Sequence, residues 1–329
     1  MSAAPPNALR LLERVAALRQ YLRSQVIGQD ALIEDLIVGI LAGGHVLLEG
    51  LPGLGKTLLV RSLAQGLGLS FARIQFTPDL MPSDVTGTQV LDEQDGRRTF
   101  RFQPGPLFAG LVLADEINRA TPKTQSAMLE AMQERSVTVA GTTHVLPDPF
   151  HVVATQNPIE LQGTFPLPEA QLDRFLFRLE VQTPTTDAMV QILGSTTATQ
   201  RPTPVAVLTS GELRELQGLV REVLCGSHLL RFAAEVVMAS HPEREGADDR
   251  TRRFVRYGAS ARAGQAIVLG AKARALLAGR PAVVRADVDQ CLLPALNHRV
   301  LLGFEAEAER LTVQGLLPHW RAAAERRSS

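Results

Sequence analysis

The sequence predicts an α/β domain followed by a smaller domain made only of helices. Short apolar runs typical of strands alternate with helical stretches over about the first 200 residues, and after them apolar residues recur only at helical spacing. Strands that are apolar along their whole length are typical of a parallel sheet covered by helices on both faces. The length of 329 residues is also enough for two domains.

The expected elements follow the chain in order. Strands are expected at 45–49, 71–76, 111–114, 151–155 and 175–181, and helices of the same domain at 29–41, 56–67, 124–134 and 188–193. Further helices are expected at 212–223, 229–240, 259–277, 286–298 and 305–317. The second half of 183–210 is rich in Gly, Ser, Thr and Pro and is interpreted as a linker. We therefore divide the chain into domains 1–200 and 201–329.

Two β-hairpins are expected as insertions in the α/β domain. The first joins runs 86–91 and 99–103 through Asp95-Gly96, and the second joins 136–139 and 143–146 through Ala140-Gly141. An Asp-Gly pair between alternating runs is a strong hairpin signal, and Ala-Gly is a weaker one.

Composition and charge exclude several classes of protein. Hydrophobic residues make up 45% and charged residues 21%, which is an ordinary globular balance. Lys+Arg equals Asp+Glu at 34 each, and this neutrality argues against a nucleic-acid partner. Cys225 and Cys291 are far apart and lack a CxxC frame, so we expect two buried, reduced cysteines and no zinc site.

Membrane insertion is not expected. Residues 1–7 lack the pattern of a signal peptide and are expected to form a frayed tail. The longest apolar run, 36–48, is shorter than the roughly 20 residues that a bilayer crossing needs. We expect a soluble, cytoplasmic protein.

Residues 50–57, Gly-Leu-Pro-Gly-Leu-Gly-Lys-Thr, fit the phosphate-binding pattern GxxxxGK[ST]. Glycines let backbone N–H groups turn toward phosphates, and the helix that follows points its positive end at them. The pattern predicts that Lys56 reaches the β- and γ-phosphates and that the Thr57 hydroxyl binds Mg²⁺. The loop also lies between a predicted strand and a predicted helix, as this motif requires.

Two carboxylates follow the apolar strand 111–114. In a protein with a phosphate-binding loop, the first acid at such a strand end, Asp115, is expected to hold Mg²⁺. The second, Glu116, is suited to act as the general base on the attacking water. The pair therefore favours a hydrolase over a kinase-like transferase.

Two more residues and one arginine-rich run are candidates for function. Asn157 follows the next strand, where its amide could hold the attacking water or simply serve an Asn-Pro turn. Arg174 could reach a neighbouring subunit's γ-phosphate, or pair with Asp173 or Glu169 on the surface. The arginine-rich run 244–256 is interpreted as a solvated loop in preference to a partner surface.

Taken together, these motifs resemble those of the AAA+ ATPases, and more narrowly the MoxR family within the helix-2-insert clade. The matching segments are 26–29, 50–57, 76–80, 114–120, 123–134, 154–158, 167–175 and 258–263. The resemblance implies a sheet ordered 5-1-4-3-2, a helical lid, and a hexameric ring with ATP between neighbouring subunits. The hairpins match the inserts of that clade.

The resemblance also implies roles for single residues. Asn157 would be the sensor that positions water, Arg174 the arginine finger acting in trans, and Arg262 the sensor arginine of the lid. Nucleotide contacts are expected from Val26, Ile27, Gly50, Pro52, Gly53, Leu54, Gly55, Lys56, Thr57, Leu58 and Asp115, with Mg²⁺ on Thr57 and Asp115.

Family members act as chaperone-like motors that remodel, assemble or activate protein complexes, often with a partner that carries a von Willebrand A domain. A helicase-type motor on DNA or RNA is the alternative from another class. The arginines of the first hairpin are offset by Asp92, Glu93 and Asp95, which disfavours it. The ATPase subunit of a metal chelatase is a further alternative that the sequence separates poorly.

Overall fold

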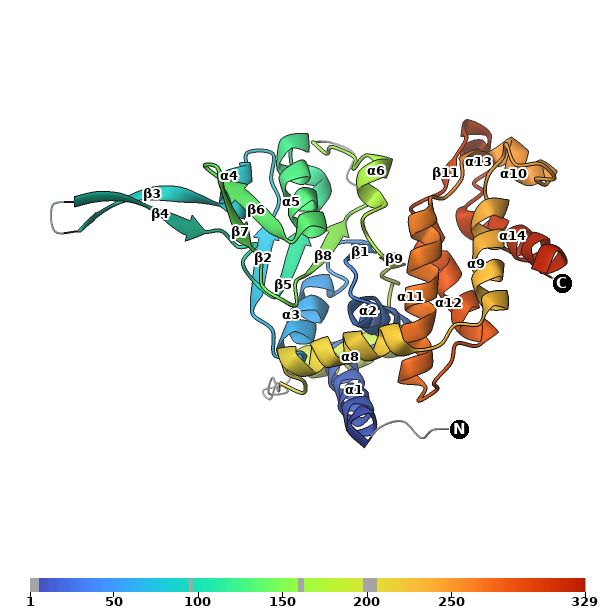
Figure 1. Cartoon of the computed structure of the whole chain (residues 1–329), viewed down its shortest axis with the longest axis horizontal. Helices are drawn as coiled ribbons and strands as arrows, with labels where there is room; N and C mark the ends of the chain where they lie inside the picture. Colours follow the sequence, from blue (N-terminus) through green and yellow to red (C-terminus); the bar gives the residue numbers. More distant parts are fainter. Residues whose placement is uncertain (1–5, 95–96, 159–162, 198–205, 329) are drawn as a thin grey trace.

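The computed structural model describes residues 6–94, 97–158, 163–197 and 206–328. An α/β part is built around a five-stranded sheet, and a helical part packs beside it (Figure 1). The strands of the sheet are β1 (Val46–Glu49), β2 (Phe71–Gln75), β5 (Leu111–Asp115), β8 (His151–Gln156) and β9 (Phe177–Glu180). All neighbours pair in parallel in the order β2-β5-β8-β1-β9. Counted in chain order from the other edge, this is the predicted order 5-1-4-3-2, which is confirmed.

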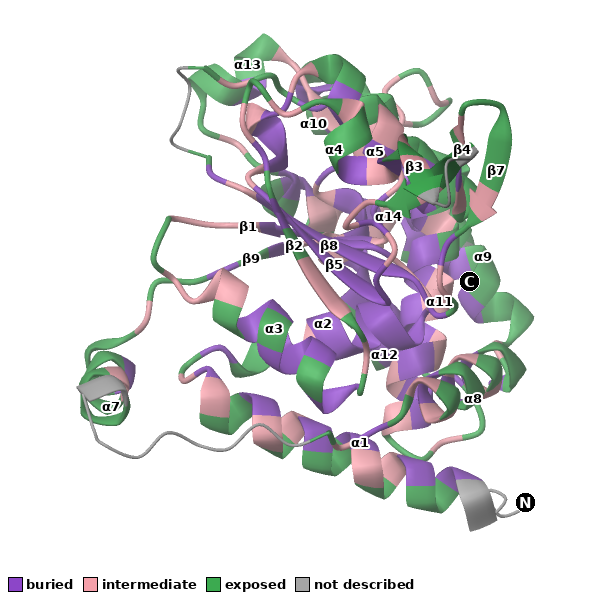
Figure 2. Ribbon diagram, turned by 90° about the vertical axis from the view of Figure 1, so that its left-hand side faces the viewer, coloured by how far each residue is buried: buried purple, intermediate pink, exposed green. Residues whose placement is uncertain are grey.

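Helices cover both faces of the sheet (Figure 2). One face carries α2 (Asp30–Leu41) and α3 (Lys56–Gly66) with α1 (Pro6–Gln25) outside them, and the other carries α4 (Pro82–Thr86) and α5 (Pro122–Glu134). In β5, Leu111 and Leu113 belong to the first core, whereas Val112 and Ala114 belong to the second. This alternation is what a strand buried on both faces requires.

Both predicted hairpins are present. Strands β3 (Gly87–Gln94) and β4 (Arg97–Pro104) form a long arm that projects from the body (Figure 1), and their predicted turn, Asp95-Gly96, lies outside the described residues. Strands β6 (Ser136–Val139) and β7 (Thr142–Val145) meet at Ala140 and Gly141, whose φ angles are 49° and 81°. Positive φ at both central residues is the requirement of a two-residue type I′ turn.

The α/β part also contains a 3₁₀ turn, η1 (Ile117–Arg119), and the helices α6 (Glu169–Leu172) and α7 (Thr186–Thr197). Most of the predicted linker, 198–205, lies outside the described residues. The helical part follows as α8 (Ser210–Glu222), α9 (Ser227–Ala239), α11 (Ala261–Leu277), α12 (Arg285–Leu296), α13 (Phe304–Ala308) and α14 (Val313–Ser328). Helix α8 packs against α1 and α2 as well as α11, so one continuous core joins the two parts.

The structure corrects four sequence predictions. Pro6 and Asn7 begin the unpredicted helix α1 and do not belong to a frayed tail. The run 244–256 is not a solvated loop, because most of it forms α10 (Asp249–Phe254) and β10 (Val255–Tyr257), which pairs with β11 (Leu301–Leu302). The segment 305–317 spans two helices and not one. Cys291 is buried as predicted, but Cys225 is only half-buried.

None of the helices in the described part of the chain has both the length and the apolar character that a bilayer crossing demands.

Candidate active site

Three neighbouring strands bring polar residues together at their carboxyl-terminal ends. Strand β1 leads into the glycine-rich loop 50–55, β5 ends at Asp115, and β8 is followed by the buried Asn157. The register pairs Glu49 with Gln156 and Ala114 with Ala154, so these strand ends lie level with one another. Predicted site residues from three separate segments are therefore neighbours in space.

The glycine-rich loop is open on its outer side. Gly53 and Gly55 have φ angles of 82° and 79°, and no heavy atom lies within 4 Å of the place where a Cβ would stand at either residue. Only glycine takes this conformation without strain, and a side chain would fill the space in front of the loop. Helix α3 begins directly after, at Lys56, so its unpaired N–H groups point at the same space. This is an anion-binding arrangement.

The other predicted loop residues differ in exposure. Pro52 and Leu58 are exposed, Leu54 is half-buried, and Gly50 packs directly against Val181 at the end of β9. The Lys56 ammonium donates a hydrogen bond to the Gly50 carbonyl and so lies over the loop. Burial lowers the pKa of Lys56, while the carboxylates of Asp115, Glu116 and Glu49 act in the opposite direction.

Asp115, at the end of β5, is surrounded by donors from two neighbouring strands and a helix. Its Oδ1 accepts a 2.7 Å hydrogen bond from the Thr155 hydroxyl, and its Oδ2 accepts two from Arg73, from Nη2 at 2.7 Å and from Nε at 3.0 Å. The Thr57 hydroxyl lies 3.4 Å from the same Oδ2. A hydroxyl beside a carboxylate oxygen is the hard oxygen donor set that Mg²⁺ prefers. The residues therefore fit the ion that the sequence predicts.

Glu116 turns away from Asp115. Its backbone is left-handed (φ 57°), and its N–H donates to the Thr155 hydroxyl at 2.8 Å. The carboxylate Oε2 accepts hydrogen bonds from Gln75 Nε2 at 2.8 Å and from Arg119 Nη1 at 3.1 Å. The side chain is about one quarter exposed. A carboxylate held in this way can face a water molecule in the open space before the loop.

Arg73, Gln75 and Thr155 contact the site although the sequence analysis did not select them. Arg73 and Gln75 alternate with the buried Ile74 on β2, so both project from the same face of this edge strand beside β5. Two polar residues two positions apart in a strand already indicate that both side chains lie on one face of the sheet. The sequence does not show that their partners are Asp115 and Glu116, because this depends on the pairing of β2 with β5.

Arg174 and Arg262 lie at the amino-terminal ends of the strands, whereas the loop lies at their carboxyl-terminal ends. Strand β9 runs parallel to β1, the loop follows the end of β1, and Arg174 precedes the start of β9. Arg262, in the first turn of α11, lies 3.4 Å from Asp173. The structure thus groups the two predicted arginines with each other and separates both from the loop of their own chain.

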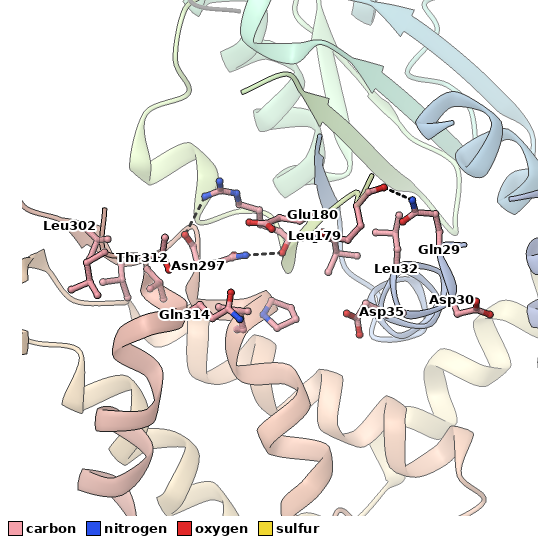
Figure 3. A pocket seen from close by; sticks show the side chains of 18 of the residues that line it. Gln29, Asp30, Leu32, Asp35, Leu179, Glu180, Asn297, Leu302, Thr312 and Gln314 are labelled. Carbon is pink, nitrogen blue, oxygen red and sulfur yellow. Dashed lines mark hydrogen bonds between the residues drawn. The ribbon is translucent and has the colours of Figure 1, made fainter. Parts of the chain in front are cut away.

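A cleft of about 690 Å³ lies between the start of α2, the end of β9 and the helical part (Figure 3). Gln29 donates to the Gln182 carbonyl on its wall at 2.7 Å. Val26 and Ile27, which were expected at the adenine, do not line this cleft. Val26 is buried in the core and Ile27 is half-buried, and the cleft wall begins with the next residue, Gly28.

The glycine-rich loop, the acidic strand end and the strand order define a P-loop ATPase of the AAA+ type. Family profiles agree: the ATPase family associated with various cellular activities (AAA) matches residues 45–177, and the AAA lid domain matches residues 247–319.

Individual relatives narrow the class to one family. The chain is 43% identical to Chaperone MoxR1 of Mycobacterium tuberculosis, over 87% of this chain and 75% of that one. It is 35% identical to Protein MoxR of Paracoccus denitrificans, over 88% and 89%. The crystal structure of a candidate ATPase from Cytophaga hutchinsonii, 36% identical, matches it with a TM-score of 0.89 over 96% of both chains. The chain belongs to the MoxR family of AAA+ ATPases.

Proposed function

We propose that this ATPase works as a ring of subunits, hexameric as its family resemblance implies, that share their active sites. ATP hydrolysis would drive a chaperone-like motor that remodels, assembles or activates protein complexes. The observation that supports shared sites is the position of Arg174. Whereas the glycine-rich loop lies at the carboxyl-terminal ends of the strands, Arg174 lies at their amino-terminal ends. An arginine there can stabilise a transition state only on another subunit.

The glycine-rich loop and the start of α3 would hold the phosphates of ATP. Lys56 would pair with the β- and γ-phosphates, and Thr57 and Asp115 would hold Mg²⁺, which neutralises phosphate charge when bound. The ion pair between Arg73 and Asp115 would hold the Asp115 carboxylate in place for this role. Val26 and Ile27 remain the predicted adenine contacts.

Glu116 would accept a proton from the attacking water as the general base. The hydrogen bonds from Gln75 and Arg119 hold its Oε2 and so fix the direction of the carboxylate. Asn157, at the end of the neighbouring strand, would orient the same water. The pairing of β5 with β8, which brings the two strand ends side by side, supports these roles.

The division into domains 1–200 and 201–329 also belongs to this proposal, with the second domain acting as a lid. A partner with a von Willebrand A domain is the expected protein partner, and a nucleic acid is not expected. The cytoplasmic location expected from the sequence remains a prediction.

The test is ATP turnover per subunit measured against protein concentration, for the wild type and for Arg174→Ala. Shared sites require a turnover per subunit that rises as rings assemble. The variant should lose at least about 100-fold in turnover while it still binds ATP. Arg231→Ala, at an exposed position on α9, is the matched control and should behave like the wild type. A turnover that is independent of concentration, with an active Arg174→Ala, would exclude shared sites.

A further inference from the structure

Asp173, the residue before Arg174, is a meeting point for two segments of the helical part. Its carboxylate accepts hydrogen bonds from the Ser260 hydroxyl at 2.9 Å, from Arg299 Nε at 2.7 Å and from Arg262 Nη1 at 3.4 Å. Ser260 and Arg262 belong to the start of α11, whereas Arg299 follows α12. The segment that carries Arg174 is therefore tied to the helical part through Asp173, the residue directly before Arg174.

Arg299 uses all of its N–H donors, four of them on residues 173–176. A guanidinium has five N–H groups, and Arg299 makes five hydrogen bonds. Besides the Asp173 carboxylate, it donates to the backbone carbonyls of Asp173, Phe175 and Leu176, on both sides of Arg174, and to the Ala295 carbonyl in α12. Its side chain is only 3% exposed. One buried cation thus fixes the backbone before and after Arg174.

The Arg174 side chain itself is held more loosely. Its Nη1 donates to the Leu129 carbonyl of α5 at 2.7 Å, while its Nε is buried and has no hydrogen-bond partner among the described residues. Since the guanidinium is only partly satisfied, its placement depends on where the backbone of 173–176 lies. That backbone is held from both sides: the Leu176 N–H donates to the His45 carbonyl within the α/β part, and Arg299 binds residues 173, 175 and 176 from the helical part.

We propose that Asp173 and Arg299 are positioning residues through which the helical part of one subunit sets the placement of Arg174. They would thereby control ATP hydrolysis on the neighbouring subunit. This inference rests on the proposed function, in which Arg174 acts in trans.

A purely structural tie is the competing explanation. The helical part is also attached to the α/β part by other ion pairs, between Glu212 of α8 and Arg14 of α1, and between Arg274 of α11 and Asp35 of α2. Removing the charge of Asp173 should therefore leave the two parts docked. Glu212→Gln is a matched control, because it removes the same charge from another tie and a glutamine can still serve the cap of α8.

The experiment compares Asp173→Asn, Arg299→Lys and Glu212→Gln in the full chain. We expect Asp173→Asn to lower turnover at least about tenfold, with the affinity for a fluorescent ATP analogue changed less than about twofold. Arg299→Lys keeps the charge but loses the planar fork, and should show the same split. It also serves as the test should Asp173→Asn fail to fold. Glu212→Gln should lower the unfolding temperature without this loss of turnover.

Mixed rings identify the subunit that is affected. Glu116→Gln subunits have an intact Arg174 but no general base, so mixing them with Asp173→Asn or Arg299→Lys subunits should restore turnover. Arg174→Ala mixed with Glu116→Gln is the reference. If the reference mixture recovers and the Asp173→Asn and Arg299→Lys mixtures do not, the two residues act on their own site and the inference is wrong. If Arg174→Ala is fully active, the shared site itself fails, and the inference falls with it.

Discussion

Asp115 and Glu116 are adjacent in sequence but lie in different surroundings. Asp115 points among Arg73, Thr155 and Thr57, whose guanidinium and hydroxyl groups surround its carboxylate oxygens. Glu116 is turned out of the strand by its left-handed backbone. The turn at Glu116 therefore places two neighbouring carboxylates in different surroundings, as the proposed roles of metal ligand and general base require.

Replacing Glu116 with glutamine should therefore separate binding from hydrolysis. Glutamine keeps the shape of the side chain but cannot accept a proton, so turnover should fall at least about 100-fold. Binding of a fluorescent ATP analogue, followed by titration, should remain within about threefold of the wild type. Glu130→Gln, at an exposed position on α5, is the control. A Glu116→Gln variant with wild-type turnover would remove Glu116 from the chemistry.

Two buried histidines join α5, α8 and the sheet. In His45, Nε2 donates to the Met132 carbonyl and Nδ1 accepts from the Val152 N–H. In His151, Nδ1 donates to the Gly44 carbonyl and Nε2 accepts from the Gln217 amide. Each ring is fully satisfied only when it is neutral, because a second proton would face another donor.

This network has a consequence for stability at low pH. Burial lowers the pKa of His45 to about 3 and that of His151 to about 4, and the Arg135 charge acts in the same direction. The unfolded chain binds these protons near pH 6.5, so the folded state binds fewer between about pH 6.5 and pH 4. The free energy of unfolding should fall with decreasing pH in this window, by up to about 1.4 kcal/mol per pH unit for each histidine.

Urea unfolding at a series of pH values tests this. His151→Gln should give a shallower dependence on pH between 6.5 and 4 than the wild type, since one group no longer contributes. The same substitution at His319, which lies at the surface of α14 beside Arg250, is the control. If the free energy of unfolding depended on pH equally in His151→Gln and the wild type, His151 would not be a source of this dependence.

At the level of residues, what the sequence could predict depended on local patterns. Lys56, Thr57, Asp115 and Glu116 follow strands at fixed offsets, so their grouping could be predicted from the order of elements alone. Arg299 could not be selected in this way. Its partner Asp173 is 126 positions away, and only packing of α12 against β9 brings the two together.

Among the elements, the second hairpin depends on a turn of fixed geometry. Gly141 has a φ of 81° and open space around its missing Cβ, so Gly141→Ala acts through the backbone alone. It should destabilise the protein by about 1 kcal/mol. Gly218, in the exposed face of α8 and also without close neighbours, is the opposite case, and Gly218→Ala should stabilise by about 0.5–1 kcal/mol. Urea unfolding measures both; effects of the same sign would contradict the backbone explanation.

The elements that were not predicted were hidden by their composition. Helix α1 contains several arginines and begins beside a Pro-rich stretch, yet Leu11, Val15, Leu18 and Leu22 recur at helical spacing and are all buried. In α10, arginines suggested a solvated loop, but Asp248 caps the helix and its Phe254 is buried. Both helices become stable only by packing against elements that are distant in sequence, which a local pattern does not contain.

For the molecule as a whole, the helical part does not have a core of its own. One cluster of buried side chains extends from Leu11 of α1 and Leu63 of α3 through α8 and α11 to Trp320 of α14. Gln217 of α8 adds a polar tie, donating to the Ile40 carbonyl at 2.9 Å. The proposed boundary near residue 200 therefore does not divide the hydrophobic core.

This continuity predicts that both parts unfold together. Trp320 is the single tryptophan and is buried, with its Nε1–H donated to the Thr251 hydroxyl, so its fluorescence reports the helical part alone. Far-ultraviolet circular dichroism reports all helices. In urea, the two transitions should share one midpoint, because exposing the helical part would also expose the inner faces of α1 and α2.

The variant Leu216→Ala, which opens a cavity where α8 meets this core, should lower both midpoints by the same amount and reduce the free energy of unfolding by about 2–5 kcal/mol. A fluorescence transition that shifts while the dichroism transition stays would show two independent domains.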